Sequence, residues 1–300
     1  MPISRRALLT APFGLKSITP AAFGLRGDGT DETAKLKALA DYLGIHGGVC
    51  VFPPGKTYLQ SEGVVFGGGG YTIDGNGSTI RMVDGTVADH RHFGLKFKCT
   101  HCNIRNLIVD GNRQRRHPAE NPCHSFYLEG ARQGVFENCH AVNAVCDGWI
   151  LWESTPGDPA SWCSNVVLHA CSADNSYRNG LSIINGFDVL VAGGRYDHSN
   201  GTAPQAGIDL EADPGGPKPS MRHVRLVGLT ATGNRGYGVQ VSGVGAPAEL
   251  SLESVLVDGS GGGATAMGFY LGAPVRLSSI RTRNLPISRA VHDHRRLWGL

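Results

Sequence analysis

Apolar and polar side chains alternate in short runs that recur along the chain at a nearly constant spacing. Each of five runs begins at a glycine, and these glycines are separated by 32, 27, 31 and 30 residues. They are Gly148, Gly180, Gly207, Gly238 and Gly268, and residues 124–130 form a looser sixth copy. The first and third residues after each glycine are apolar, as in Ile208 and Leu210. This period of two predicts a half-buried β-strand.

A second alternating run precedes the first one in every repeat. These runs lie at 103–111, 134–139, 165–171, 188–194, 223–229 and 250–259. Each repeat therefore contains at least two short strands and no predicted helix. Repeats of this length and content predict stacked coils, in which every strand pairs with the coils above and below it at about 4.8 Å. The predicted fold is an all-β, single-stranded parallel β-helix, which is a solenoid.

Other recurring positions fit the same architecture. Asparagine recurs between the two strands, at Asn143, Asn175 and Asn234 with Asn200 slightly displaced, where a left-handed corner and stacked amides are expected. Cys139 and Cys171 are expected to form an inward stack that continues as Leu229 and Val255. Residues 30–44 carry Leu36, Leu39, Ala40 and Leu43 on one helical face, after Asp31 and Glu32. This helix is expected to cover the open first coil.

Composition excludes several classes of protein. The 300-residue chain contains 43 glycines, is 41% hydrophobic and only 18% charged, which argues against disorder and against long helical bundles. Its formal net charge of +3 is scattered, so we expect no nucleic-acid partner. No run of about 18 apolar residues is present, so we expect no membrane span.

The N-terminus is similar to a twin-arginine export signal, with Arg5 and Arg6 before a short apolar stretch and small residues at 19–21. This predicts a signal over 1–21, a β-helix domain over 22–300, and a secreted or periplasmic protein. An ordinary flexible basic arm is the alternative. The spacing of Cys99 and Cys102 is typical of half a zinc site, but a second matching pair is missing among the eight cysteines.

The opening of the chain resembles a known family. Residues 23–39 read FGLRGDGTDETAKLKAL, and GGVCVFPPGKTYLQ (47–60) and YTIDGNGSTI (71–80) follow. This pattern is similar to the start of the rhamnogalacturonase/epimerase-type domain of the pectate-lyase-like superfamily. The resemblance implies a right-handed parallel β-helix and assigns Gly27, Asp28, Gly29 and Asp31 to shaping the first turn. It does not define a reaction, because members include lyases, hydrolases, epimerases and tailspikes. The Gly-His-Gly and Arg-x-Lys signatures of polygalacturonases and the Asp-Pro-His motif of alginate epimerases are absent.

Outward positions of the strands that follow the glycines are expected to line a groove. One column contains Tyr127, Ile150, Ser182, Asp209, Gln240 and Tyr270, and the next contains Glu129, Trp152, Ile184, Glu211, Ser242 and Gly272. Insertions at 111–122, 153–162, 199–205 and 212–220 would wall this groove, which suits a linear polymer.

Three carboxyl groups are the candidate catalytic acids and bases. Asp209 and Glu211 lie on one face of a strand, roughly 6.5–7 Å apart by strand rise, and Asp147 lies two coils away, roughly 9–10 Å. These separations are near the range of inverting glycosidases, and mutual repulsion would raise one pKa. A solvated acidic strand or a calcium site formed by Asp209, Glu211 and Asp213 is the alternative, and no other cofactor is predicted.

Cationic and aromatic side chains complete the predicted site. Arg178 and His124 are expected at one end of the groove, where they could serve a lyase or an epimerase as cation and base. The predicted substrate-binding residues are Tyr127, Trp152, Tyr177, His198, Arg113, Arg115, Arg116 and Gln240. Arginines recognise acidic sugars through bidentate contacts, and aromatic rings stack on sugar rings. Each of these side chains could equally be a solvated surface or turn residue.

The sequence therefore predicts a secreted enzyme that acts on an acidic, uronate-containing polysaccharide, by hydrolysis or by β-elimination or epimerisation. The alternative is a non-catalytic glycan-binding or structural β-helix, similar to a phage tailspike or a surface adhesin. A monomer and a homotrimer are both compatible with the sequence, and the tail at 292–298 would cap the last coil or mediate assembly.

Overall fold

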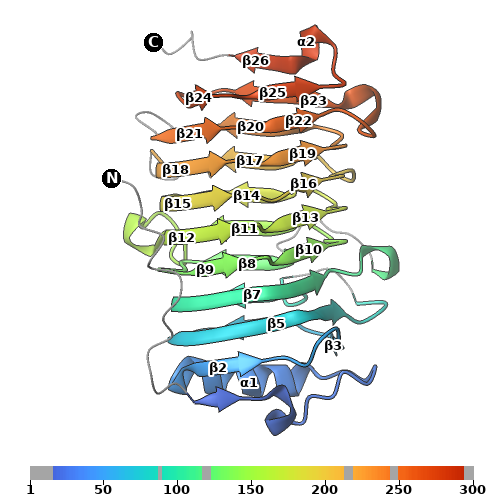
Figure 1. Cartoon of the computed structure of the whole chain (residues 1–300), viewed down its shortest axis with the longest axis vertical. Coiled ribbons are helices and arrows are strands. Elements are labelled where there is room, and N and C mark those ends of the chain that lie inside the picture. The colour runs from blue at the N-terminus through green and yellow to red at the C-terminus, as the bar shows by residue number, and fades with distance from the viewer. Residues whose placement is uncertain (1–15, 87–89, 117–122, 213–218, 244–248, 294–300) are drawn as a thin grey trace.

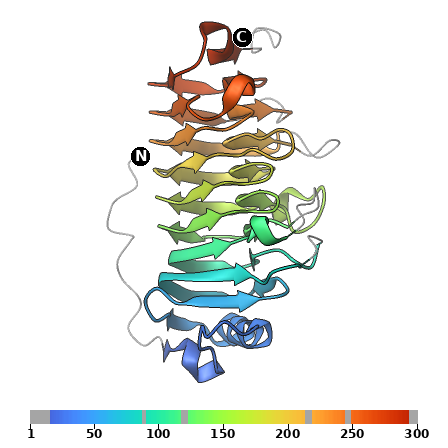
Figure 2. The same cartoon turned by 90° about the vertical axis from the view of Figure 1, so that its right-hand side faces the viewer.

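The strands stack into one elongated solenoid. The computed structural model describes residues 16–86, 90–116, 123–212, 219–243 and 249–293. Among these residues every strand pairing is parallel, and the strands form sheets of 14, 9 and 3 strands, here called sheets A, B and C. The coils rise from the N-terminal helix at one end to a short C-terminal helix at the other (Figures 1 and 2). The predicted all-β, right-handed parallel β-helix is confirmed.

Sheets A and B run along the stack, and sheet C contains three short strands near its C-terminal end. Sheet A contains β1 (Ser17–Ile18), β2 (Gly48–Val51), β3 (Thr57–Gln60), β5 (Gly69–Met82), β7 (Thr100–Asp110), β9 (Val135–Glu137), β10 (His140–Val142), β12 (Ser164–His169), β13 (Ser172–Asp174), β15 (Gly186–Ala192), β16 (Tyr196–Asp197), β18 (Met221–Val227), β21 (Leu250–Glu253) and β24 (Arg276–Ser278). Sheet B contains β4 (Val64–Phe66), β6 (Leu95–Phe97), β8 (Phe126–Glu129), β11 (Trp149–Trp152), β14 (Leu181–Ile183), β17 (Ile208–Glu211), β20 (Tyr237–Ser242), β23 (Met267–Leu271) and β26 (Val291–Asp293). Sheet C contains β19 (Thr230–Thr232), β22 (Leu256–Asp258) and β25 (Arg281–Arg283). The helices are α1 (Thr33–His46) and α2 (Ile287–Ala290), with 3-10 turns at Pro20–Phe23, Arg113–Arg115, Pro159–Ser161 and Gly263–Thr265.

The sequence predicted at least two strands per coil, and the structure contains a third short strand in many of them. In the middle coils it is β10, β13 or β16, which pair in order next to the end of β7. These segments have two or three residues each, and β10 and β13 bury only their central alanines, Ala141 and Ala173. Such short segments carry too few positions to show a period of two.

One continuous apolar core runs along the inside of the stack. The inward residues of sheet B lie in register, so Phe126 stacks on Trp149 with ring centroids 3.9 Å apart, and Leu181 and Ile208 continue the column. Cys139, Cys171, Leu229 and Val255 are buried as predicted. Of the eight cysteines, Cys99 and Cys102 are joined in a disulfide, and the other six are buried and form no disulfide.

The recurring glycines lie where neighbouring coils approach each other closely. A Cβ atom built on Gly148 would lie 2.7 Å from the carbonyl oxygen of Gly180, and one on Gly180 would lie 2.5 Å from that of Gly207. Real Cβ atoms do not approach a backbone oxygen so closely, so a side chain here would push the coils apart. The backbone at this corner continues the ladder, because the amide of Gly180 donates to Ala206 and that of Leu181 to Gly207.

The asparagine ladder is shorter than predicted. Asn143 and Asn175 have left-handed backbones, with φ of 51° and 58°, and the Asn175 amide donates to the Asn143 side chain at 2.8 Å. Asn234 does not continue this ladder, because the left-handed corner of its coil falls one residue earlier, at Gly233. Its side chain instead satisfies the backbone of the neighbouring coil at Ser199 and Tyr196.

Helix α1 covers the first coil, as predicted. Leu36, Leu39, Ala40 and Leu43 are buried in the main core. Glu32 lies at the N-terminal boundary of the helix, and its carboxylate accepts the backbone amides of Arg26 and Gly27, which fixes the turn between them. The described helices contain no segment long and apolar enough to cross a membrane.

The predicted boundary at residue 21 lies inside ordered structure. β1 pairs with β2, and Pro20 is buried at the start of a 3-10 turn. The export signal itself lies mainly in residues outside the described part, so the boundary stays a prediction.

A methyl group at Gly180 is expected to destabilise the stack. Gly180→Ala should lower the free energy of unfolding by about 1–3 kcal/mol, because the new Cβ overlaps the Gly207 carbonyl. Gly67→Ala is the matched control, since a Cβ there has no neighbour within 4 Å and the backbone is not left-handed. Urea denaturation measures both. Equal stability of the two variants would contradict a steric role for this corner.

Candidate functional site

The outward column of sheet B is in register but is not solvent-exposed along its centre. Ile150 pairs with Ser182, Ser182 with Asp209, and Asp209 continues to Gln240 on the next coil. Ile150 is completely buried, and Ser182 and Asp209 are 1% exposed. These three positions were expected to face an open groove, and the structure buries them instead.

Asp147 lies at the corner before this column and holds a buried ion pair. It is completely buried, and Arg178 from the next coil binds it in bidentate fashion, with Nε at 2.8 Å from Oδ1 and Nη2 at 2.6 Å from Oδ2. The Asn179 amide and the Ser182 hydroxyl donate to the same carboxylate at 3.0 Å each. Burial alone would raise the pKa of Asp147, but the Arg178 charge and these donors hold it well below its ordinary value. Asp147 is therefore ionised.

Asp209 has the opposite environment. Burial raises its pKa well above the ordinary value, and the charges of Glu211 and Asp147 raise it further. The Asn179 side chain donates to Oδ2 at 3.0 Å, whereas Oδ1 has no hydrogen-bond partner within the described residues. The raised pKa favours the protonated form of Asp209, which is the form that a proton donor needs.

A cavity of about 140 Å³ connects these groups. The strands β11, β14 and β17 supply most of its wall, and Arg178 enters from the corner of its coil. The lining residues are Ile150, Trp152, Arg178, Ser182, Ile184, Asp209, Glu211 and Ala212. Four of the residues predicted as site residues, Arg178, Asp209, Glu211 and Trp152, thus meet in one cavity, with Asp147 directly behind it.

His124 lies behind the ion pair. It is buried, its Nδ1 is 3.3 Å from Asp147 Oδ2, and neither ring nitrogen makes a hydrogen bond to the described residues. Burial lowers the pKa of His124 more than the neighbouring carboxylate raises it, so the ring is neutral. His124, Cys146 and Asp147 bring ligand atoms within 4.8 Å of one another. Arg178, Asn179 and Ser182 already occupy the Asp147 oxygens, so this cluster serves the ion pair rather than a metal.

Asp209 and Glu211 could offer carboxylate oxygens to a hard cation from the cavity. Asp213, the third residue predicted for a calcium site, lies outside the described residues. Calcium binding therefore stays a prediction.

The aromatic and polar residues predicted to bind substrate fall into separate groups. Trp152 lies in the cavity wall, and its ring centroid is 6.5 Å from that of Tyr127, which is 9% exposed under the Lys96 ammonium group. Gln240 is the next residue after Asp209 in the column. His198 takes the ladder position after Asn175, with φ of 56°, and pairs with Asp174 at 2.7 Å.

The arginines of the 111–122 insertion are largely engaged with the backbone. Arg113 stacks over Tyr177 at 5.0 Å and donates to the carbonyls of Asn175 and Ser176. Arg116 is 5% exposed and donates to the Gly111 and His92 carbonyls. Arg115 is exposed. None of these arginines lines the cavity at Asp209.

Ser182 was expected to line the groove, but neither Ser182 nor Asn179 was predicted as a catalytic or substrate-binding residue. Asn179 donates to both Ser182 and Asp209 and accepts the Ala206 amide, so it fixes the spacing between the coils at the site. The sequence contained one indication of this role. Asn179 directly precedes Gly180, just as the predicted catalytic residue Asp147 directly precedes Gly148.

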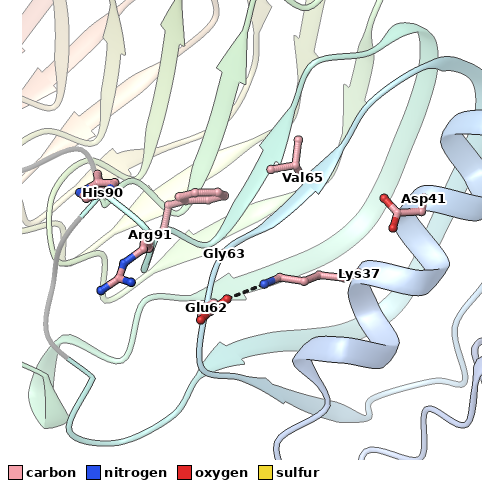
Figure 3. A pocket seen from close by; sticks show the side chains of 8 residues that line it. Lys37, Asp41, Glu62, Gly63, Val65, His90 and Arg91 are labelled. Carbon is pink, nitrogen blue, oxygen red and sulfur yellow. Dashed lines mark hydrogen bonds and ion pairs between the residues drawn. The ribbon is translucent and has the colours of Figure 1, made fainter.

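A second hollow lies at the N-terminal end of sheet B. It has a volume of about 350 Å³ and lies between α1, β4 and the segment around Arg91 (Figure 3). Lys37 and Glu62 pair across it at 2.5 Å. Val65 on its wall begins the outward column that continues through Lys96 and Tyr127 toward Asp209. Charges of both signs line this hollow, so it shows no preference for an anion or a cation.

Fold and site define a right-handed parallel β-helix with a buried acidic cavity on one sheet. No protein-family model matches the chain, and no curated protein sequence is similar to it. Solved structures with the same fold include the iota-carrageenase of family GH82 from A. fortis, with a TM-score of 0.60 and 14% identity over 92% of this chain and 58% of that one. The tailspike protein gp49 of the Acinetobacter baumannii bacteriophage Fri1, a capsular polysaccharide depolymerase, has a TM-score of 0.54 and 14% identity over 91% of this chain and 53% of that one. The pre-mature gene product 12 of bacteriophage phi29 has a TM-score of 0.60 and 12% identity over 90% of this chain and 42% of that one. This chain thus spans between 42% and 58% of the length of these neighbours, and the similarity is one of fold.

Removal of Arg178 is expected to destabilise the protein strongly. Arg178→Met leaves the Asp147 charge buried without its partner, which costs about 3–5 kcal/mol. Adding Asp147→Asn should recover much of this loss, because the buried charge is then gone. Chemical denaturation of both single variants and the double variant measures the coupling. Additive effects would show that the pair is not coupled.

Asp209 should make stability fall as pH rises. A carboxyl group with a raised pKa in the folded state stabilises the fold below the unfolded pKa of about 4, and that contribution is lost as pH rises through the folded pKa. Asp209→Asn should flatten this decline, whereas Glu253→Gln at an exposed position of sheet A should not. Urea denaturation between pH 4 and 8 measures the slope. An unchanged slope in Asp209→Asn would show that Asp209 is ionised in the fold.

Proposed function

We propose that this protein hydrolyses an acidic polysaccharide at the cavity on sheet B, with Asp209 as general acid. The observation that carries the proposal is the contrast between two buried carboxyl groups. Arg178 lowers the pKa of Asp147 and so favours its ionised form. Burial and the charges of Glu211 and Asp147 raise the pKa of Asp209 and so favour its neutral form. Carboxyl groups with pKa values pushed in opposite directions are typical of acid–base sites.

Glu211 is the proposed base. It follows Asp209 by two residues on β17, so both side chains leave the same face of the strand, and Glu211 is exposed where Asp209 is buried. A strand rise of about 3.3 Å per residue separates their backbones by about 6.6 Å. Inverting glycosidases use carboxyl groups about 6.5–9.5 Å apart, with a water molecule between them. Asp209 would protonate the leaving oxygen while Glu211 takes a proton from the attacking water.

Arg178 is proposed to attract the charged group of the substrate. Its Nε and Nη2 bind Asp147, and its Nη1 makes no hydrogen bond to the described residues. The side chain lines the cavity and is 28% exposed. A carboxylate or sulfate on the sugar could accept from Nη1. Trp152 in the same wall offers an apolar ring to the sugar.

Similar solved structures support a polysaccharide as the substrate class. They include an iota-carrageenase with bound iota-carrageenan fragments and a capsular polysaccharide depolymerase. A soluble polymer of this kind is met outside the cytoplasm, which agrees with the proposed export through the Arg5–Arg6 signal.

Loss of the proton donor or of the base should abolish turnover. Asp209→Asn and Glu211→Gln are each expected to lower kcat by about 10²–10⁴-fold on the polymer that wild type degrades, and Glu253→Gln should be unchanged. Incubation with a panel of uronate- and sulfate-bearing polysaccharides, followed by a reducing-end assay, measures this.

The products separate the rival reactions. Hydrolysis gives reducing ends without near-ultraviolet absorbance, whereas β-elimination gives an unsaturated uronate that absorbs there. Absorbing products would overturn the hydrolytic assignment. Binding without turnover by wild type would favour the non-catalytic glycan-binding alternative.

A further inference from the structure

A separate hollow lies where the strands of sheet A begin, away from the acidic cavity. Its volume is about 430 Å³. It is framed by the 153–162 insertion and by the start of β12, β15 and β18, which lie one above the other in Figure 1. The lining residues are Arg132, Pro159, Ala160, Trp162, Ser164, Phe187, Pro219 and Arg222.

Four of these residues form a column with one member per coil. Arg132 pairs with Ser164, Ser164 with Phe187, and Phe187 with Arg222. Successive coils lie about 4.8 Å apart, so the two arginines are about 14 Å from each other along the stack. The spacing is set by the backbone ladder, so it is preorganised.

The hollow is positively charged and partly aromatic. Among the described residues, its lining contains two arginines and no acidic side chain. Arg132 donates to the Ala160 carbonyl, which leaves other guanidinium donors, and the Arg222 side chain makes no hydrogen bond or ion pair to the described residues. Phe187 is 38% exposed between them. The nearby acids Asp188 and Glu249 both pair with His223 rather than with Arg222.

The wall on the other side is rigid. Trp162 is 5% exposed, and its indole nitrogen donates to Glu153 at 3.2 Å. The Glu153 carboxylate also accepts the Gly157 amide, and Ser161 bonds to Thr155 within the same insertion. The insertion is therefore held by its own polar contacts, and the hollow does not need a ligand to keep its shape.

We propose that this hollow is a second carbohydrate-binding site, which takes a segment of an acidic oligosaccharide. Arg132 and Arg222 bind carboxylate or sulfate groups, and a sugar ring packs on the exposed face of Phe187. This proposal does not depend on the chemistry of Asp209. It rests on the proposed function only for the choice of an acidic glycan as the ligand. Nucleic acid would require a longer basic stripe than two arginines.

The insertion connects this hollow to the acidic cavity along the chain. It begins directly after Trp152, which lines the cavity, and ends at Trp162, which lines the hollow. Under this proposal, one part of a polymer chain binds on sheet A and another part of it enters the cavity on sheet B.

Calorimetry with the inactive Asp209→Asn protein tests the site separately from turnover. The probes are size-defined oligosaccharides of six to eight residues, one series carrying carboxylates, one carrying sulfates, and one neutral. Arg222→Gln and Phe187→Ala, each added to Asp209→Asn, should weaken binding of a charged series about tenfold or more. Arg276→Gln is the matched control, an exposed arginine on β24 of the same sheet outside the hollow.

The outcomes are distinct. Binding that is lost in Arg222→Gln, kept in Arg276→Gln and weakened by added salt supports the site, and the series that binds identifies its charged group. This result holds whether or not wild type shows turnover, so it is independent of the hydrolytic proposal. Equal affinity of the Arg222 and Phe187 variants and their parent, equal affinity for the neutral series, or no binding of any series would overturn it.

Discussion

The close parallel stacking of coils is the constraint on which the rest of the molecule depends. Paired strands lie about 4.8 Å apart, so residues one repeat apart in sequence become direct neighbours. At the corner before sheet B the approach is closer still, because Gly148, Gly180 and Gly207 leave no room for a Cβ beside the carbonyl of the next coil. Glycine is thus required here by contact between coils, and the left-handed corners elsewhere use asparagine, histidine or other residues.

Stacking also creates the electrostatic contrast at the site. Asp147 accepts hydrogen bonds from Arg178, Asn179 and Ser182, all supplied by the next coil, and is ionised. Asp209, one coil further, is bonded by Asn179 alone within the described residues and is neutral. Both carboxyl groups are buried, so the number and charge of their donors separates their protonation states. One short segment of a single coil, residues 176–183, supplies these donors. It therefore sets the protonation states of both Asp147 and Asp209.

Sequence patterns predicted the parts of the structure that repeat. The period of two and the glycine spacing gave the register of sheet B, and this register brings Asp209, Glu211, Trp152 and Arg178 together. The third strand of the coils could not be located in the sequence, because β10 and β13 bury one small residue each. The prediction placed Asn234 in the ladder, but the corner of its coil is shifted by one residue, to Gly233. A shift of one residue cannot be detected in a repeat whose length varies between 27 and 32 residues.

The depth of Asp209 and the bidentate Arg178–Asp147 pair could not be read from the sequence, because an outward position on a strand is expected to face solvent.

The two sites proposed above lie on different sheets, which has a consequence for a polymeric ligand. The cavity with Asp209 and Glu211 lies on sheet B, and the hollow with Arg132 and Arg222 lies at the start of the strands of sheet A. An anionic polymer is repelled by ionised carboxylates, so a site that must use acids for chemistry gains little binding from them. If a polymer binds at the arginines as proposed, entry of a neighbouring segment into the cavity becomes an intramolecular event, with an effective concentration in the millimolar range for a short flexible connection. The solenoid can thus divide binding and chemistry between two faces of the same coils, because each face has its own outward column while both share one core.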